Sequence, residues 1–487
     1  MHDCRDGTVV SEPLADRGVA HRWRRQELFL LSCAAFIVGC GLVVVDLSTV
    51  NHVQAVSIRL LLAFIAAAVL IHVAIRRRAR FADPFIAPAA LLLAGIGLVE
   101  IHRLDIAEQV QAITSGQPVP VARAPLQSLW AVVGAALFIA TLLVVRDYRR
   151  LQRFPWLITL CGLALLLSPL VPGIGHTIRG ATLWVRIGGL SIQPAEAAKV
   201  LLPIGFSAYL TRHGRALALL RSTVAGLPVP RLRDFAPLLV MWVASLGVLI
   251  FQRDLGTSLL FFGLFVVLLY ASTAQRSWPL IGLALFLVGS LIGWVLFAHV
   301  QLRVLLWLNP FRGDGTSQVA LGLYGIADGG LFGTGLGQGY PSLVPFAESD
   351  YIFSSISEEL GLVGFLACLL LYAVLAQRGL RAAQQSRDTF GSLLGISFAT
   401  VVALQTFVVI GGVTRLIPLT GLTTPFMSYG GSSLVANLII MGMLIRLSDS
   451  VRAPRAAFKQ AVFSTGPVPV TSPNDATEAI SIVGGDS

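Results

Sequence analysis

Twelve hydrophobic runs, separated by polar segments, constrain the fold of this 487-residue chain more than any other feature of its sequence. Each run is close to the ~20 residues that cross the hydrocarbon core of a bilayer as an α-helix. Only 13% of the residues are charged, against about 25% in soluble globular proteins. We therefore predict an all-α, polytopic membrane protein with about 12 transmembrane helices. The runs lie near residues 28–46, 57–75, 84–100, 127–145, 156–171, 194–211, 235–251, 256–272, 279–299, 359–376, 390–410 and 431–447.

The basic residues set the orientation of these predicted helices. If the N-terminal tail is placed in the cytoplasm and the sides then alternate, most of the 36 Lys and Arg fall in cytoplasmic segments. This is the bias that the positive-inside rule describes. Both termini are then cytoplasmic, and the largest outer loop is 300–357. The net charge of +11 is therefore a topology signal, and we expect no binding to nucleic acid.

Four regions follow from the same pattern. Residues 1–26 are predicted to be a cytoplasmic tail, and 27–125 to form additional N-terminal transmembrane helices with an outer loop. Residues 126–447 form the predicted membrane core, and 448–487 have the composition of a disordered cytoplasmic tail. The five Cys lie in the N-terminal tail or inside apolar runs, so we expect neither a disulfide nor a metal cluster.

Two outer stretches place charge at the start of a predicted helix. Glu196 lies near the N-terminal end of the sixth run, with Lys199 three residues later on the same face. An intramembrane Lys usually indicates function, so Lys199 is either a cation for an anionic lipid headgroup or simply the partner of Glu196. Asp254, in the turn Gln252–Thr257, is either the N-cap of the eighth run or part of a polar site with Arg253.

The segment Thr414–Leu434 breaks the helical pattern with Pro, Gly and hydroxyl residues before the last run. Non-helical backbone at membrane depth persists only where it lines a cavity or is buried in protein. Ser428 either satisfies this backbone or hydrogen-bonds a sugar or phosphate. The guanidinium of Arg415 suits phosphate.

The stretch Pro345–Gly364 places four carboxylates where a membrane span begins, namely Glu348, Asp350, Glu358 and Glu359. Carboxylates at this depth are costly without a partner or a function. Asp350 precedes the aromatic and aliphatic residues Tyr351–Phe353. A carboxylate beside a partly desolvated surface can have a raised pKa and act as a general base. All these stretches fall on the predicted outer side, which indicates one outward-facing site that accepts anions.

At least one of Glu358 and Glu359 is predicted to be structural. Its role would be capping, or pairing with an outer-loop arginine such as Arg179, Arg186 or Arg415.

Five ordered motifs lie between about Gly180 and Arg446. The motifs are W-x-R-x-G…Q-P-x-E-x-x-K at Trp184–Lys199, Q-x-D-L-G-T at Gln252–Thr257, G-L-F-G-x-G-L-G-Q-G at Gly330–Gly339, D-x-I-F…E-E-L-G at Asp350–Gly361 and P-F-M-S-Y-G-G-S-S at Pro425–Ser433. Together they resemble the SEDS family (shape, elongation, division and sporulation), of the RodA/FtsW/SpoVE type. The segments around Asp350 and Arg415 resemble the elongation, RodA-like type and its actinobacterial members.

The resemblance implies a peptidoglycan glycosyltransferase. Such enzymes polymerise lipid II at the outer face of the cytoplasmic membrane and work with a class B penicillin-binding protein. It further implies that Asp350 is the essential acidic residue. The other residues that it places around a central cavity are Trp184, Gln193, Glu196, Lys199 and Ser428.

A mechanism follows as a hypothesis. Asp350 would take the proton of the acceptor hydroxyl, and inversion would release undecaprenyl pyrophosphate. Lys199 and outer-loop arginines such as Arg186 and Arg415 would stabilise the leaving group. No acidic spacing demands a cofactor, although a divalent cation, Mg²⁺ or Mn²⁺, could share the pyrophosphate.

Two alternative functions stay open. A lipid II flippase would suit broken helices and a buried Lys199–Glu196 pair, and a non-catalytic scaffold for a penicillin-binding protein would need only the outer surface. A flippase requires access from both sides, whereas the polar motifs here all face outward, which favours an enzyme.

Overall fold

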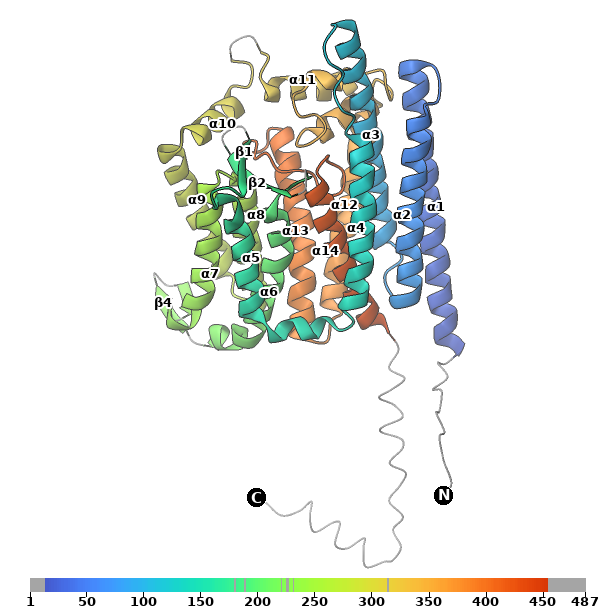
Figure 1. Cartoon of the computed structure of the whole chain (residues 1–487). Coiled ribbons are helices and arrows are strands. Elements are labelled where there is room, and N and C mark those ends of the chain that lie inside the picture. The colour runs from blue at the N-terminus through green and yellow to red at the C-terminus, as the bar shows by residue number, and fades with distance from the viewer. Residues whose placement is uncertain are drawn as a thin grey trace, which may run out of the picture.

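A computed structural model describes residues 14–453, except 179–180, 188–189, 220, 225–226, 231 and 313–314. The described chain is a bundle of long helices that stand side by side (Figure 1). Both ends of the described chain lie at its lower end in Figure 1. The twelve long helices are α1 (Leu14–Val50), α2 (Ala55–Arg78), α3 (Ile86–Thr114), α4 (Ala124–Val144), α5 (Pro155–Leu167), α6 (Pro194–Leu219), α7 (Leu232–Phe251), α8 (Leu255–Thr273), α9 (Ser277–Leu296), α12 (Ile352–Gln384), α13 (Thr389–Val413) and α14 (Gly431–Arg452).

Each predicted hydrophobic run overlaps one of these twelve helices, and the all-α membrane fold is confirmed. The runs 156–171 and 279–299 continue past the ends of α5 and α9. Among the described residues, eight are long and apolar enough to cross a membrane by length and composition: α1, α2, α4, α8, α9, α12, α13 and α14. α1 already begins at Leu14, within the predicted tail 1–26, so the helix extends on the N-terminal side of the apolar run. Similarly, α14 continues to Arg452, and the rest of the predicted tail 448–487 lies outside the described residues.

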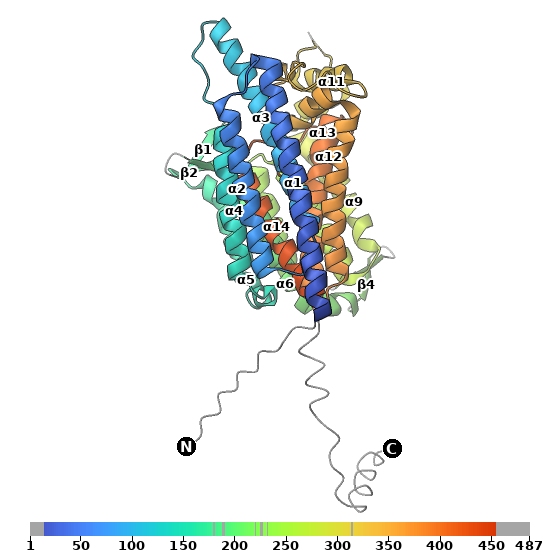
Figure 2. The ribbon, with the colours of Figure 1, turned by 90° about the vertical axis from the view of Figure 1, so that its right-hand side faces the viewer.

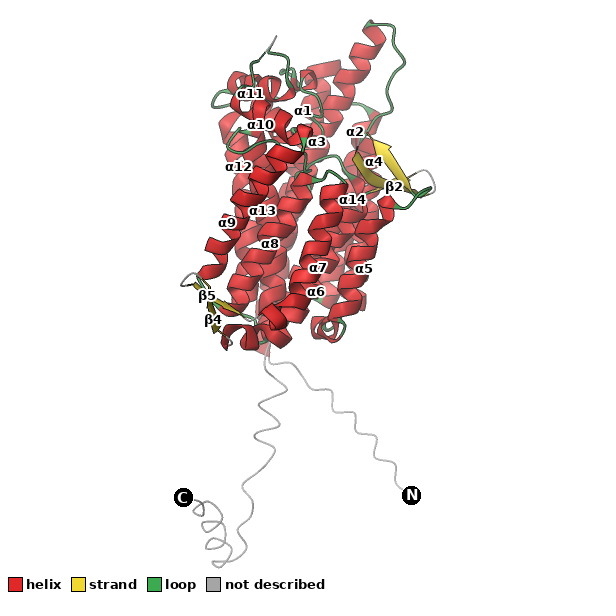
Figure 3. Ribbon diagram, turned by 90° about the vertical axis from the view of Figure 1, so that its left-hand side faces the viewer, coloured by secondary structure: helices red, strands yellow, loops and turns green. Residues whose placement is uncertain are grey.

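The predicted outer loop 300–357 contains helical structure that the sequence reading did not anticipate. α10 (Ala298–Leu308) and α11 (Gln318–Gly329) lie at the upper end of the bundle, followed by a 3₁₀ turn at Pro341–Leu343 (Figure 1). Short antiparallel strands were also missed, since strands of three to seven residues give little periodicity. β1 (Gly175–Ile178), β2 (Ala181–Ile187) and β3 (Leu190–Ile192) pair near the upper end, whereas β4 (Arg221–Val224) and β5 (Leu227–Pro230) pair near the lower end (Figure 3).

Small residues allow close packing near the loops that precede α12 and α14. Gly97 of α3 lies directly against the backbone of Met427, where an added Cβ would stand 2.1 Å from the carbonyl oxygen. Glycine therefore lets α3 touch the loop before α14.

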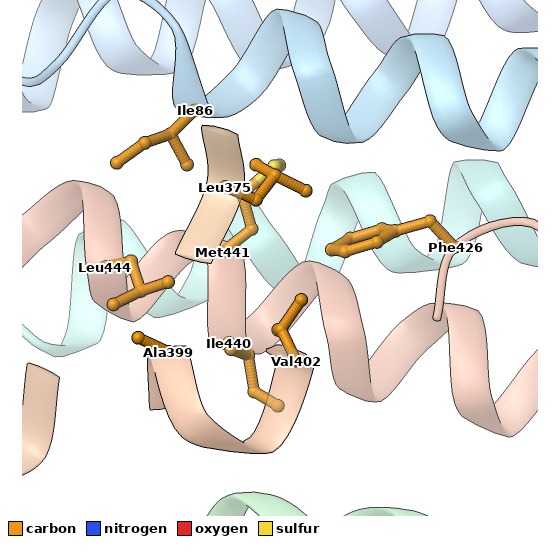
Figure 4. A pocket seen from close by; sticks show the side chains of 8 residues that line it. All are labelled: Ile86, Leu375, Ala399, Val402, Phe426, Ile440, Met441 and Leu444. Carbon is orange, nitrogen blue, oxygen red and sulfur yellow. The ribbon is translucent and has the colours of Figure 1, made fainter. Parts of the chain in front are cut away.

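The centre of the bundle is apolar, and a small cavity between α3, α12, α13 and α14 has only hydrophobic side chains in its lining (Figure 4). This cavity offers no polar group to a ligand.

Helices α1 and α2 form the right-hand edge of the bundle in Figure 1 and face the viewer in Figure 2, and buried polar contacts fasten them to α3. Asp46 of α1 accepts from His102 of α3 at 3.0 Å, and Ser57 of α2 lies 2.9 Å from the same ring nitrogen. Farther down, Glu27 of α1 contacts His72 of α2 at 2.8 Å. Because unpaired polar groups are costly at membrane depth, these contacts fix the position of the N-terminal pair.

Candidate active site

Asp350 lies in the short loop between the 3₁₀ turn Pro341–Leu343 and α12. Two neighbouring carbonyls anchor this loop to the loop before α14: the Tyr429 amide donates to Glu348 O at 2.7 Å, and the Ser428 hydroxyl donates to Ser349 O. With two consecutive carbonyls held, the backbone at Asp350 has little freedom. The structure thus brings together two segments that are distant in the sequence.

The environment of Asp350 suits a general base. Burial raises the pKa of Asp350 to about 6, with the charge of Glu348 adding to this effect and that of Arg303 opposing it. The Ser349 hydroxyl donates to Asp350 Oδ1 at 3.2 Å. A carboxylate of this pKa is ionised at neutral pH and still accepts a proton readily.

Arg303 is a cation of this site that the sequence reading missed. It lies on α10, and its Nη1 donates to Thr420 O at 3.0 Å. Its positive charge acts on both Asp350 and Asp254. The available signal was a single arginine within the otherwise apolar segment 302–308 of the outer loop.

Asp254 is the N-cap of α8, as one of its two predicted roles required. Its Oδ1 accepts from the Thr257 amide at 2.9 Å. The other oxygen, Oδ2, is buried and has no hydrogen-bond partner among the described residues. Burial raises the pKa of Asp254, and the nearby charge of Glu196 adds to this effect. Capping therefore explains one carboxylate oxygen and leaves the second unused.

Lys199 is held in an internal network on α6. Its side chain is only 2% exposed, forms an ion pair with Glu196 and donates to Gln405 Oε1 at 2.8 Å. Gln405 in turn donates to Thr423 O at 2.7 Å. The structural interpretation of Lys199 is thereby supported, whereas its role toward a lipid headgroup stays a prediction.

The strand residues of the first motif occupy different environments. Trp184 is half-buried on β2, and Arg186, on the same strand, is exposed. Gln193 follows β3, and its backbone N–H donates to Ser432 Oγ at 3.0 Å. This bond joins the start of α6 to the start of α14.

Arg415 and Ser428 both contact backbone. The Arg415 guanidinium donates to Trp307 O at 2.7 Å and to Leu308 O at 2.9 Å. It therefore holds the end of α10, the helix that carries Arg303. The Ser428 hydroxyl also accepts from the Thr424 amide at 2.7 Å, so it satisfies the irregular backbone as one of its predicted roles proposed.

Glu358 and Glu359 both have structural contacts. Glu359 accepts from Arg103 Nε at 2.8 Å and from the Gly337 amide at 3.0 Å, while Glu358 accepts from the Tyr340 amide. The predicted pairing with an outer-loop arginine is made by Arg103, which lies in the predicted outer loop 101–125 and pairs with Glu359, instead of by Arg186 or Arg415. Arg415 is engaged at α10. The third proposed partner, at position 179, lies outside the described residues.

The site therefore has two connected halves at the upper end of the bundle. Asp350 lies with Arg303 and Ser428, and the Lys199–Glu196 pair lies within electrostatic reach of Asp254. Among the described residues, no group of three or more His, Cys, Asp or Glu is arranged to hold a metal ion. The arrangement combines a proton acceptor with fixed positive charge.

These features define a polytopic membrane protein with a polar site at one end of its helices. Residues 84–453 match the family model described as "Cell cycle protein", of the FtsW, RodA and SpoVE type. The chain is 45% identical to the "Peptidoglycan glycosyltransferase RodA" of Mycobacterium tuberculosis, over 92% of this chain and 93% of that one. It is 42% identical to the protein of the same name in Mycobacterium leprae, over 95% and 97% of the two chains.

A solved structure described as "Structural coordination of polymerization and crosslinking by a peptidoglycan synthase complex" is also similar. It aligns with a TM-score of 0.59 and 26% identity, over 77% of this chain and 99% of that one. The present chain belongs to the FtsW, RodA and SpoVE family. The family model begins after α1 and α2, so these two helices precede the shared core.

Proposed function

We propose that this protein is a peptidoglycan glycosyltransferase that polymerises lipid II at the outer face of the cytoplasmic membrane during cell elongation. The upper end of the bundle faces outward, and both termini are cytoplasmic. Similarity to the mycobacterial enzymes over more than nine-tenths of the chain supports the activity. The basic residues of the lower end, including Arg76, Arg77 and Arg78 at the end of α2, support the orientation.

The observation that carries the proposed chemistry is the environment of Asp350. Its carboxylate has a pKa of about 6, and the loop before α14 holds the backbone carbonyl that directly precedes Asp350. In the proposed reaction, the carboxylate takes the proton of the acceptor hydroxyl while the hydroxyl oxygen bonds to the anomeric carbon of the donor. The bond from that carbon to the pyrophosphate oxygen breaks, and undecaprenyl pyrophosphate leaves with the bonding electrons. A single displacement by one base inverts the anomeric centre.

The leaving group develops negative charge, which requires positive charge nearby. Arg303 supplies it in this proposal, because its guanidinium donates to the carbonyl of Thr420 and forms no ion pair with a carboxylate among the described residues. Lys199 contributes less, since Glu196 already neutralises it. A divalent cation, Mg²⁺ or Mn²⁺, would bind here mainly through the pyrophosphate.

A class B penicillin-binding protein is the proposed partner. The similar solved structure concerns a complex that coordinates polymerization with crosslinking, which supports such an assembly. The partner would crosslink the glycan strands that this enzyme makes.

Purified protein, with and without the partner, tests the proposal by forming glycan strands from labelled lipid II. We expect strands from the wild type and none from Asp350→Asn. Asp147→Asn is a matched control, because Asp147 is exposed beside the 3₁₀ turn between α4 and α5, away from the site. Activity of Asp350→Asn at the control rate would contradict the assignment of the base, and an inactive, folded wild-type complex would contradict the enzymatic function.

A further inference from the structure

The N-terminus of α4 lies against the loop that holds Asp350. Gln127, in the first turn of α4, donates from Nε2 to Ser428 O at 3.1 Å. Its Oε1 accepts from the Gly430 amide at 3.3 Å. The side chain is buried, so both ends of its amide are used to fix the turn that anchors the carbonyls before Asp350.

Arg123, the residue that precedes α4, reaches the Asp350 loop itself. Its Nη2 lies 3.5 Å from Glu348 Oε1, and its Nη1 lies 2.8 Å from Glu108 Oε2. Glu348 is two residues before Asp350. The guanidinium thus bridges a carboxylate of α3 and a carboxylate of the catalytic loop.

Helix α3 fixes this bridge in place. Asp105 Oδ2 accepts from the Ala124 amide at 2.7 Å and so caps α4. Glu108 lies one turn farther along α3 and holds Arg123. Because both contacts come from one rigid helix, the position of the Arg123 guanidinium is set before any substrate binds.

From these contacts we propose that Arg123 is a positioning residue for Asp350, acting through its ion pair with Glu348 and supported by Gln127 on the same helix. This inference rests on the proposed function of Asp350 as the base. Arg123 does not touch the reacting atoms. It sets where the Glu348–Asp350 backbone lies and how much negative charge Asp350 experiences.

The charged and titratable groups that face Asp350 are Glu348, Arg303 and the adjacent Tyr351. Glu348 raises the pKa of Asp350, and Arg123 offsets the charge of Glu348. The side chains of Arg123 and Glu348 are 27% and 15% exposed, so solvent screens the pair in part. Loss of Arg123 should therefore raise the pKa of Asp350 by a modest amount.

The pH dependence of the polymerisation rate tests the inference on the full-length protein with its partner. In Arg123→Gln, the acid limb should move to higher pH, so that the rate at pH 5 relative to pH 8 falls about threefold, equivalent to a rise of half a unit in the pKa of Asp350 from about 6. In Glu348→Gln, the acid limb should move to lower pH. Arg123→Lys should keep the wild-type profile, because it keeps the charge.

The matched control is Arg149→Gln, which breaks an exposed Arg–Asp contact with Asp388 near the lower end of the bundle. A wild-type profile in both Arg123→Gln and Glu348→Gln would overturn the inference. If Arg123→Gln does not fold, Glu348→Gln alone decides, since it removes the charge without removing the α4 contacts of Gln127. Asp350→Asn is measured in parallel: its full activity would contradict the role of Asp350 as the base, on which this inference rests, whereas an unchanged profile with an inactive Asp350→Asn would contradict only the role of Arg123.

Discussion

Asp350 and the Lys199–Glu196 pair both place charge at the same end of the bundle, but they differ in whether the charged side chain is paired. Lys199 is neutralised by Glu196 and hydrogen-bonded to Gln405, so its network is closed. Asp350 has a raised pKa and is held through its backbone neighbours, which leaves its carboxylate available. In the proposed mechanism, the paired charge of Lys199 is therefore structural, whereas Asp350 is positioned through its backbone and its carboxylate can accept a proton.

The sharpest test of this comparison is Asp350→Asn. Loss of a general base typically costs about 10²–10⁴-fold in rate. The midpoint of thermal unfolding should stay the same or rise, because burial disfavours the carboxylate that the substitution removes. Strand synthesis and thermal unfolding, measured on the same sample, check both parts. A large drop in thermal stability would instead mark Asp350 as structural.

Lys199→Met should do the opposite and act first on stability. It leaves Glu196 buried without its partner, which typically costs about 3–5 kcal/mol in the free energy of unfolding. The double variant Lys199→Met with Glu196→Gln should recover most of this loss, because neither charge remains. Denaturation in detergent measures both variants. If Lys199→Met is as stable as the wild type, the network is not closed as described.

Arg303→Gln should lower the polymerisation rate about a hundredfold, the typical effect of removing one fixed group that stabilises developing charge. The acid limb of its pH profile should also move to higher pH, because Arg303 opposes the rise in the pKa of Asp350. Arg303→Lys, which keeps the charge, is the control. A wild-type rate in Arg303→Gln would return the leaving-group role to Lys199.

The smallest effect concerns the pH dependence of the wild type. Asp350 acts as a base only when deprotonated, so the rate should be constant above its pKa of about 6 and fall about tenfold per pH unit well below it. The Lys199–Glu196 pair should leave no limb of its own near this value. Rates measured from pH 5 to 8 at constant ionic strength check this expectation. A limb that persists in a residually active Asp350 variant would assign it to another group.

The membrane fold and the segments that form its helices could be predicted from the sequence, as could the importance of the carboxylates that lead into α12. Apolar runs of about 20 residues have few other solutions, and carboxylates at membrane depth are conspicuous. The sequence also indicated both alternatives for Asp254 and Ser428, because capping and backbone hydrogen bonds depend on local sequence.

Which charges meet depends on the tertiary structure. Arg303 and Arg103 carry no local pattern that assigns a partner, yet the charge of Arg303 acts on Asp350 and Arg103 pairs with Glu359. Ion pairs between distant segments depend on how helices pack, and packing depends on contacts such as that of Gly97 with Met427. Asp350 could therefore be predicted from the sequence, whereas the cation that acts on it and the residues that hold its loop followed from the fold.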